Sequence, residues 1–431
     1  MEKYPILNER LFLRSPSINV CFRAIIEGTF EKAKIEEALK KVCVKHPFLY
    51  CSVEIDNDYN AWLIQNNNSV NIEYYKSDEM DWQTWYKKTD NIPFDISHGT
   101  LVKFCVITGQ NTEIIILGHH IIGDGIGYLN LVKDILLALD NRIEMTPQLP
   151  PYKSIDRNFK ETVLFSSGIK FYANRLNKKW KKSRIQFSEK DYITFFEQYR
   201  NKYKPDFLMA SIEGDNLNNL LEKSKINGLT INEIIATAFS ISAMEIFGCK
   251  NIGLGIAVNY RNELVSEPNQ CMGNFVSGIM TKAHNKPSND FIASAKIIAA
   301  MLKEQLKNKK NRHLIVHFLN ELDKDLIETI MYAAYGNFNH SVARKTAKLI
   351  GEQKKNKVLG ISNLGRHEFK NYENIKIIDL QFIEPAFPAN TLTVGIITNN
   401  SKMNFCLRYN EGEINTEVVK SIFKRGIEHL I

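Results

Sequence analysis

The chain has 431 residues, a length that suggests two or three domains of about 100–200 residues each; 44% of the residues are hydrophobic and 24% are charged. This composition excludes a small disulfide-stapled peptide, a collagen and an intrinsically disordered chain. Lys and Arg outnumber Asp and Glu by 56 to 48, for a net charge of +8, and because the basic residues are mostly scattered lysines they do not favour nucleic-acid binding.

The cysteine spacing and the hydropathy indicate the cellular compartment in which the protein works. Seven cysteines are widely spaced and never form a Cys-x-x-Cys pair, so we expect neither a disulfide framework nor a zinc ribbon. The N-terminus lacks the apolar core of a signal peptide, and no apolar run approaches the roughly 18 residues of a membrane span. We therefore expect a reduced, cytoplasmic protein without a membrane span.

The first part of the chain alternates strand and helix patterns. Residues 20–27 predict a strand, and helical spacing predicts a helix over 30–46 that Pro47 ends. Further strands are predicted at 48–55 and 61–65. Residues 101–108 and 112–118 predict a β-hairpin, and a mostly apolar stripe over 126–137 predicts a helix directly after a short loop.

The second part repeats this alternation after three prolines within residues 146–151. We place the interdomain connection at 166–205, between an N-terminal domain at 1–165 and a C-terminal domain at 206–431. The patterns in the C-terminal domain predict strands at 208–213, 251–260, 357–362, 375–382, 390–398 and 403–409, and helices at 230–247, 290–307, 323–335 and 416–431. Two halves of similar content indicate two similarly built α/β domains.

The residues that carry chemistry lie between the hairpin and the helix that follows it, as His119-His120-Ile121-Ile122-Gly123-Asp124-Gly125. Successive side chains at a strand end point to opposite faces, so one imidazole can face a cleft while the other faces inward. A metal site would require His119 and His120 to converge with Asp124 on one ion, which this geometry disfavours. A single imidazole with a near-neutral pKa suffices for general acid–base catalysis. From its position alone, Asp124 is equally an N-cap of the following helix.

The motif His-His-x-x-x-Asp-Gly resembles the signature of the chloramphenicol acetyltransferase superfamily, which includes nonribosomal peptide condensation domains, alcohol O-acetyltransferases and polyketide-associated acyltransferases. Other segments resemble family motifs in the same order. Residues 39–50 resemble a helix ending in His-Pro-x-Leu-Arg, with Tyr50 in place of Arg, and 257–261 resemble a strand ending in Arg. Residues 272–276 resemble the Gly-Asn-Phe segment and 362–365 the Ser-Asn-Leu-Gly turn, so the resemblance spans nearly the whole chain.

The resemblance implies an α/β (two-layer α+β) fold, in which two chloramphenicol acetyltransferase-like domains form a pseudo-dimeric V with a central tunnel. It also implies an acyltransferase that moves an acyl group from a thioester to a hydroxyl or amine without an acyl-enzyme. His120 would be the general base. Acyl-CoA or a phosphopantetheinyl thioester on a carrier protein would be a co-substrate, and no tightly bound cofactor or metal is expected.

The resemblance assigns roles to further residues of the motif. His119 would be structural, Asp124 would pair with Arg261 to shape the loop, and Gly125 would keep the approach to His120 open. Gly127 stands where many relatives have Ser, which removes a hydroxyl from that position.

A donor for the oxyanion is also needed. Ser362 and Asn363 are our candidates for oxyanion or tunnel residues, although a backbone amide would also serve, and Asn363 equally suits a turn before Gly365.

Partners and alternatives follow from the same resemblance. We expect a small-molecule alcohol or amine acceptor, an acyl or peptidyl carrier protein as a further partner, no nucleic acid, and a monomer. Two alternatives stay open: a discrete condensation enzyme that forms amide or ester bonds between carrier-bound substrates, and a catalytically silent carrier-binding module.

The lysine-rich runs at 178–184, 303–312 and 354–357 could meet phosphates or a carrier protein, or be solvated helix faces. His313 and His317 could line a pocket, but a surface or core role suits them better.

Overall fold

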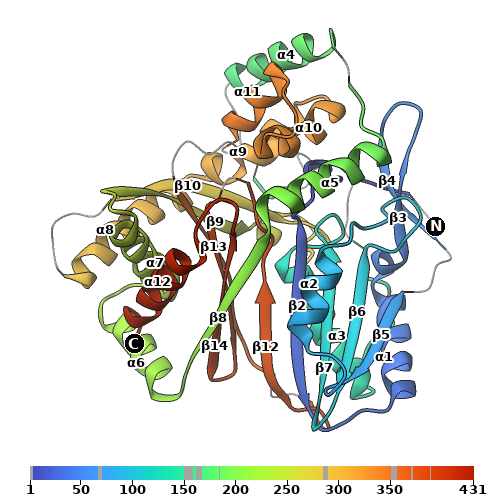
Figure 1. Ribbon diagram of the computed structural model, residues 1–431, viewed down its shortest axis with the longest axis vertical. Helices are drawn as coiled ribbons and strands as arrows, with labels where there is room; N and C mark the ends of the chain where they lie inside the picture. The colour runs from blue at the N-terminus through green and yellow to red at the C-terminus, as the bar shows by residue number, and fades with distance from the viewer. Residues whose placement is uncertain are drawn as a thin grey trace.

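The computed structural model describes residues 3–66, 70–149, 159–161, 167–183, 185–284, 290–350, 357–369, 372–388 and 390–431. Two large sheets stand side by side in Figure 1, each with helices packed on it, and further helices lie above them. The lysine run at 354–357 lies outside the described residues except for Lys357.

The first sheet carries the predicted hairpin. Its strand order is β12-β2-β7-β6-β5, formed by β2 (Asn19–Glu27), β5 (Asn71–Lys76), β6 (Val102–Thr108), β7 (Asn111–His119) and β12 (Ile377–Ile383). The helices of this half are α1 (Lys32–Lys45), α2 (Trp82–Asp90) and α3 (Gly125–Leu139). A small sheet of order β1-β4-β3 (Tyr4–Pro5, Ala61–Gln65 and Cys51–Ile55) completes it. The predicted strand at 48–55 begins later than expected, because Pro47 starts a 3₁₀ turn over Pro47–Tyr50.

The second sheet has the order β10-β9-β11-β13-β14-β8. Its strands are β8 (Pro205–Glu213), β9 (Asn251–Asn259), β10 (Val276–His284), β11 (Val358–His367), β13 (Leu392–Asn399) and β14 (Lys402–Asn410). Its helices are α6 (Gly214–Ile226), α7 (Ile231–Phe247), α8 (Phe291–Lys307) and α12 (Thr416–Glu428). Helix α7 begins at a reciprocal capping box between Thr230 and Glu233 and ends at Gly248, whose φ is +63°.

Strand β12 does not keep to the predicted division at 206–431. It follows β11 in the chain but pairs antiparallel with β2, with Leu380 opposite Ala24. Asp379 on β12 accepts a 2.7 Å hydrogen bond from Asn404 on β14, so the strand also joins the two sheets. Its apolar pattern predicts a strand correctly but contains no information about which sheet it enters.

The segment predicted as an interdomain connection, 166–205, contains two long helices. These are α4 (Ser167–Trp180) and α5 (Glu189–Tyr203), the latter started by a capping box between Ser188 and Asp191. Helix α5 crosses the front of the molecule in Figure 1, and α4 packs on α11 above the sheets. This upper layer also contains α9 (Lys309–Asn320), α10 (Lys324–Tyr335) and α11 (Ser341–Leu349).

None of the described helices alone has the length and apolar character to cross a bilayer. Helices α6 and α7 meet these two criteria only when taken together, as a pair bent by 104°.

Candidate active site

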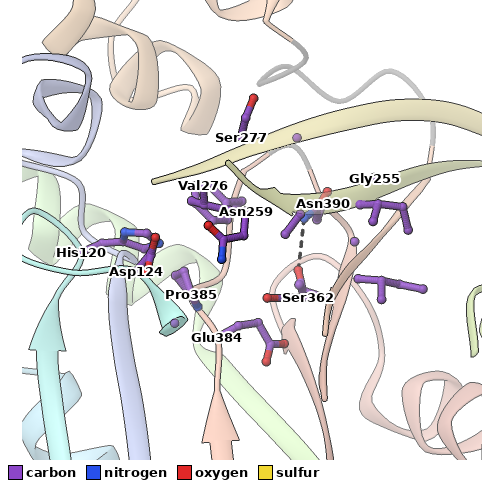
Figure 2. Close-up of a pocket in the computed structure, with 18 of the residues that line it drawn as sticks. His120, Asp124, Gly255, Asn259, Val276, Ser277, Ser362, Glu384, Pro385 and Asn390 are labelled. Atoms are coloured by element: carbon purple, nitrogen blue, oxygen red, sulfur yellow. Dashed lines mark hydrogen bonds between the residues drawn. The ribbon is translucent and has the colours of Figure 1, made fainter. Parts of the chain in front are cut away.

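A cavity of about 360 Å³ lies where the two sheets meet. It is lined by His120 after β7, by the ends of β9 and β10, by β11, and by the segment that follows β12 (Figure 2). This volume falls within the range of pockets that hold small-molecule ligands. Most of the lining is apolar, and the polar lining residues are His120, Asp124, Asn259, Ser277, Ser362, Asn363, Glu384, Asn390 and Thr393.

His120 presents its ring to this cavity while being only 4% exposed. The ring centroid lies 4.8 Å from that of Phe12 and 6.2 Å from that of Phe387. Burial lowers the pKa of His120, and the nearby Asp124 charge offsets this only in part. The imidazole is therefore neutral at pH 7, the state in which it can accept a proton.

Phe12, which packs on His120, is fixed by the helical layer. It ends the 3₁₀ turn η1 (Asn8–Phe12), and Arg10 within that turn forms a 2.7 Å ion pair with Glu328 of α10. Arg14 bonds the same carboxylate, and all three side chains are buried. Buried ion pairs to α10 therefore hold the turn that carries Phe12 in place beside His120.

His119 faces away from this cavity, as strand alternation predicts. It is fully buried, its Nδ1 accepts a 3.2 Å hydrogen bond from the Ile121 N–H, and its ring packs edge-on against Phe94. Burial, together with the neighbouring His120, lowers the pKa of His119 to about 3. The two imidazoles therefore have separate partners, an arrangement that suits a structural His119 better than a shared metal ion.

Asp124 combines the capping role that its position suggested with the ion pair that the resemblance implied. As the N-cap of α3 it accepts a 2.8 Å hydrogen bond from the Gly127 N–H. Its two oxygens also accept hydrogen bonds of 2.7 and 2.8 Å from Arg261, and a fourth of 2.8 Å from the Phe275 N–H. Burial alone would raise the pKa of Asp124, but the charge and hydrogen bonds of Arg261 hold it below its ordinary value.

Arg261 extends this contact to the connection between β9 and β10. It is 1% exposed, donates to the Gly273 carbonyl at 3.2 Å, and lies over the Phe275 ring at 4.6 Å. The Asp124 N–H also donates to the Gly273 carbonyl, at 3.1 Å. The motif loop of the first sheet is therefore bonded to the second sheet directly beside His120.

Two glycines, one that ends the motif and one in the first turn of α3, lie in close packing. A Cβ atom at Gly125 would lie 2.7 Å from Leu364 Cδ2 and 3.4 Å from Phe382, both at the cavity wall. A side chain at this position would therefore push against the part of the cavity wall formed by Leu364 and Phe382. A Cβ atom at Gly127 would lie 3.3 Å from the Gly273 carbonyl oxygen, against the ion pair.

Ser362 and Asn363 both line the cavity with His120. They lie within β11, not in a turn between elements, at a point where the strand register shifts between Asn363 and Arg366. The Asn363 side-chain oxygen accepts a 2.9 Å hydrogen bond from the Gly365 N–H, and Gly365 has a φ of +87°. Asn363 therefore stabilises the chain before Gly365, as the sequence suggested, but it does so at a register shift within β11.

The segment at 39–50 positions the motif indirectly. His46 is fully buried at the end of α1, and its Nε2 lies 2.7 Å from Asp134 of α3. Lys45 pairs with the same carboxylate at 2.8 Å. These bonds attach α1 to α3, the helix that Asp124 caps, so this segment supports the site without entering it.

His313 and the lysine run at 303–312 belong to a different cavity. His313, Lys309 and Arg312 line a second space of about 300 Å³, and His313 lies 3.0 Å from Glu263. Val258 lines this space, whereas its neighbours Ala257 and Asn259 line the first. The two cavities therefore lie on opposite faces of β9.

Besides Asn259, Ser277, Asn390 and Thr393 of the cavity lining, sequence reasoning missed two polar residues that bear on the chemistry of the site. Asn274 Nδ2 lies 3.0 Å from His120 Nδ1, and although its segment was recognised from the resemblance, this contact was not. Glu384 was passed over entirely. The available signal for Glu384 was a lone acidic residue between an apolar strand and Pro385, a pattern that does not by itself indicate a cavity.

Comparison with known proteins identifies the family to which this chain belongs. The condensation-domain family matches residues 9–431. Bacitracin synthase 2 of Bacillus licheniformis is 21% identical over 393 residues, which cover 82% of this chain but only 15% of that synthase. The chain therefore corresponds to a small part of its curated relatives.

Solved structures give the same fold across the full length. The trichothecene 15-O-acetyltransferase TRI3 from Fusarium sporotrichioides has a TM-score of 0.69 at 11% identity, covering 99% of this chain and 95% of that one. The first condensation domain of the CDA synthetase has a TM-score of 0.64 at 11% identity, covering 98% and 92%. The predicted superfamily and its α/β fold of two chloramphenicol acetyltransferase-like domains are confirmed, and this chain belongs to the condensation-domain family.

Proposed function

We propose that this protein transfers an acyl group from a thioester to a hydroxyl or amine acceptor, with His120 as the general base. The family and the fold neighbours support a transferase. The observation that carries the proposal is the neutral imidazole of His120, which lines a ligand-sized cavity between the two sheets.

The proton on His120 must lie on Nδ1 if Nε2 is to act as the base. A hydrogen bond from the ring to the His120 backbone carbonyl raises the pKa of His120, and Nδ1 is the ring nitrogen nearer the main chain. The carbonyl can only accept, so it favours the Nδ1–H form and leaves the Nε2 lone pair free. Asn274 places Nδ2 3.0 Å from Nδ1 while its Oδ1 accepts from the Val276 N–H at 3.3 Å, so in that form the amide must turn by half and give up the bond from Val276 for its oxygen to face Nδ1–H.

In the reaction, Nε2 removes the proton of the acceptor hydroxyl or amine as its oxygen or nitrogen attacks the thioester carbonyl. The tetrahedral intermediate collapses, the carbon–sulfur bond breaks, and the imidazolium returns the proton to the departing thiolate. A positioned base of this kind contributes about 10²–10⁴-fold to the rate. Ser362 and Asn363 are candidates for contact with the oxyanion, which requires donors at about 3 Å.

A screen for thiol release tests the proposal. The protein is mixed with an acyl-CoA series or with acylated carrier protein, together with a panel of alcohols and amines. We expect acceptor-dependent thiol release that falls by about 10²–10⁴-fold in His120→Ala and is unchanged in His98→Ala, because the His98 side chain is 79% exposed and does not line the cavity. Release that persists in His120→Ala would contradict the general-base role.

The same screen separates the alternatives. Transfer only from the carrier protein would identify a discrete condensation enzyme that acts on carrier-bound substrates. Binding of the carrier protein with no transfer from any donor would identify a silent carrier-binding module.

A further inference from the structure

A buried carboxyl group of the cavity has no role in the proposed chemistry. Glu384 directly follows β12, lines the same cavity as His120 and is 2% exposed. Neither of its carboxyl oxygens has a hydrogen-bond partner among the described residues. Figure 2 shows this carboxyl directed toward Ser362 and away from His120. A polar group in this state lowers stability unless a ligand or solvent in the cavity compensates it.

The second sheet leaves a place for this carboxyl. Gly395 on β13 is the residue paired with Ser362 on β11, and a Cβ atom at Gly395 would overlap Glu384 Oε2. The Glu384 carboxyl thus occupies the space of the missing side chain, on the sheet face beside Ser362. Its position is defined by the backbone of two strands and does not depend on a flexible surface loop.

Among the described residues, no cationic side chain forms an ion pair with this carboxyl. The charge that acts on it is that of Arg408 of β14, which forms a 3.0 Å ion pair with Asp90. Cys406 on the same strand is its other titratable neighbour and is an uncharged thiol. Burial raises the pKa of Glu384 well above its ordinary value. The backbone N–H groups of Glu384 and Arg408, which lie near the carboxyl but outside hydrogen-bonding geometry, and the Arg408 charge lower it only in part. Without a ligand the group therefore holds its proton.

We propose that Glu384 binds a cationic nitrogen of the acceptor substrate, so that the cavity selects acceptors that carry an ammonium group in addition to their nucleophile. This inference rests on the proposed function, because it assigns the chemical class of the acceptor. An ammonium group that enters beside Gly395 displaces the carboxyl proton to solvent. It then forms charge-assisted hydrogen bonds with the carboxylate in a site of low dielectric.

Selectivity follows from the same contact. An uncharged acceptor of equal length leaves the carboxyl protonated and unpaired, and therefore binds without this gain. A hydrogen bond to a charged group corresponds to about a tenfold to hundredfold difference in affinity. The nucleophile then lies at the His120 end of the cavity and the ammonium group at the Glu384 end.

Calorimetry with simple probes tests this site without requiring turnover. Amino alcohols from aminopropanol to amino-octanol are titrated at neutral pH, each against the alkanol of the same length, in two buffers that differ in ionisation enthalpy. We expect one chain length to bind about tenfold to hundredfold more tightly than its alkanol, with release of a proton. Glu384→Gln should abolish both the preference and the proton release, whereas Asp140→Asn, which alters a buried carboxyl at the far end of α3 and outside the cavity lining, should retain both.

Two further variants make the test specific. Gly395→Ala, which displaces the carboxyl without removing it, should weaken the preference. His120→Ala should retain it, because binding of the ammonium group does not require the base. Equal affinity for every pair, or a preference that persists in Glu384→Gln, would overturn the inference. If the protein prefers amino alcohols as described but transfers no acyl group, the proposed function is overturned while the ammonium site at Glu384 stands.

Discussion

The Asp124–Arg261 pair permits the most quantitative prediction, through the substitution Asp124→Asn. The carboxylate accepts four hydrogen bonds of 2.7 to 2.8 Å, two from Arg261 and one each from the N–H groups of Gly127 and Phe275. An asparagine oxygen can replace one carboxylate oxygen and keep two of these bonds. Its NH₂ group must then face one guanidinium N–H and one backbone N–H, in either orientation of the amide.

The cost follows mainly from the charge that remains. Arg261 is 1% exposed and loses its only carboxylate partner among the described residues. Removal of one member of a buried ion pair costs about 3–5 kcal/mol. We therefore expect Asp124→Asn to lower the free energy of unfolding, measured by urea denaturation, by about 3–5 kcal/mol, and to lower transferase activity with it.

A double-mutant cycle provides the control. Asp124→Leu combined with Arg261→Met should cost less than the sum of the two single changes, because no charge is left unpaired. Glu417→Gln, which removes an exposed ion pair with Lys420 on α12, should leave the unfolding midpoint unchanged. A loss below about 1 kcal/mol for Asp124→Asn, or strict additivity in the cycle, would refute the role assigned to this pair.

The remaining predictions concern the cavity. Gly125→Ala should push Leu364 into the cavity and lower transferase activity, at a stability cost of about 1 kcal/mol. The matched control in the same kinetic assay is Gly278→Ala, whose Cβ would meet only ordinary contacts. Equal activity in the two variants would contradict the predicted obstruction. Glu384→Gln should gain stability relative to the wild type as pH rises. The pKa of Glu384 is higher in the folded state, so above the ordinary carboxyl pKa the unfolded wild-type chain releases a proton that the folded chain retains, and the wild type loses stability with increasing pH. Urea denaturation at pH 5 and pH 8 checks this, and a difference between the two proteins that is constant or shrinks would count against a buried, protonated Glu384.

Local patterns predicted the elements around the motif closely. The hairpin expected at 101–108 and 112–118 is β6 and β7, and the helix expected after the loop is α3. The apolar pattern over 230–247 predicted α7 nearly to the residue, because a capping box and a C-terminal glycine mark its ends. These features depend on residues close in sequence, and therefore a pattern within one window suffices to find them.

The features that were missed depend on more distant relations. Helix α4 has a buried stripe of Ala173, Leu176 and Trp180, but its exposed lysines obscured that period. The contact of Asn274 with His120 joins residues 154 positions apart, and Glu384 enters the cavity only because β12 crosses to the first sheet. No local period encodes such pairings, so the polar partners of the cavity could not be derived from the sequence.

The pH dependence of transfer tests the role of His120 most directly. With the donor and acceptor found in the thiol-release screen, kcat/KM reports the ionisation of the free enzyme. Because burial lowers the pKa of His120, activity should persist through pH 6.5 and decline only at lower pH, and Asn274→Asp should move this decline to higher pH by placing a carboxylate beside Nδ1. A decline that begins above pH 6.5 in the wild type, or one that Asn274→Asp leaves in place, would contradict His120 as the base.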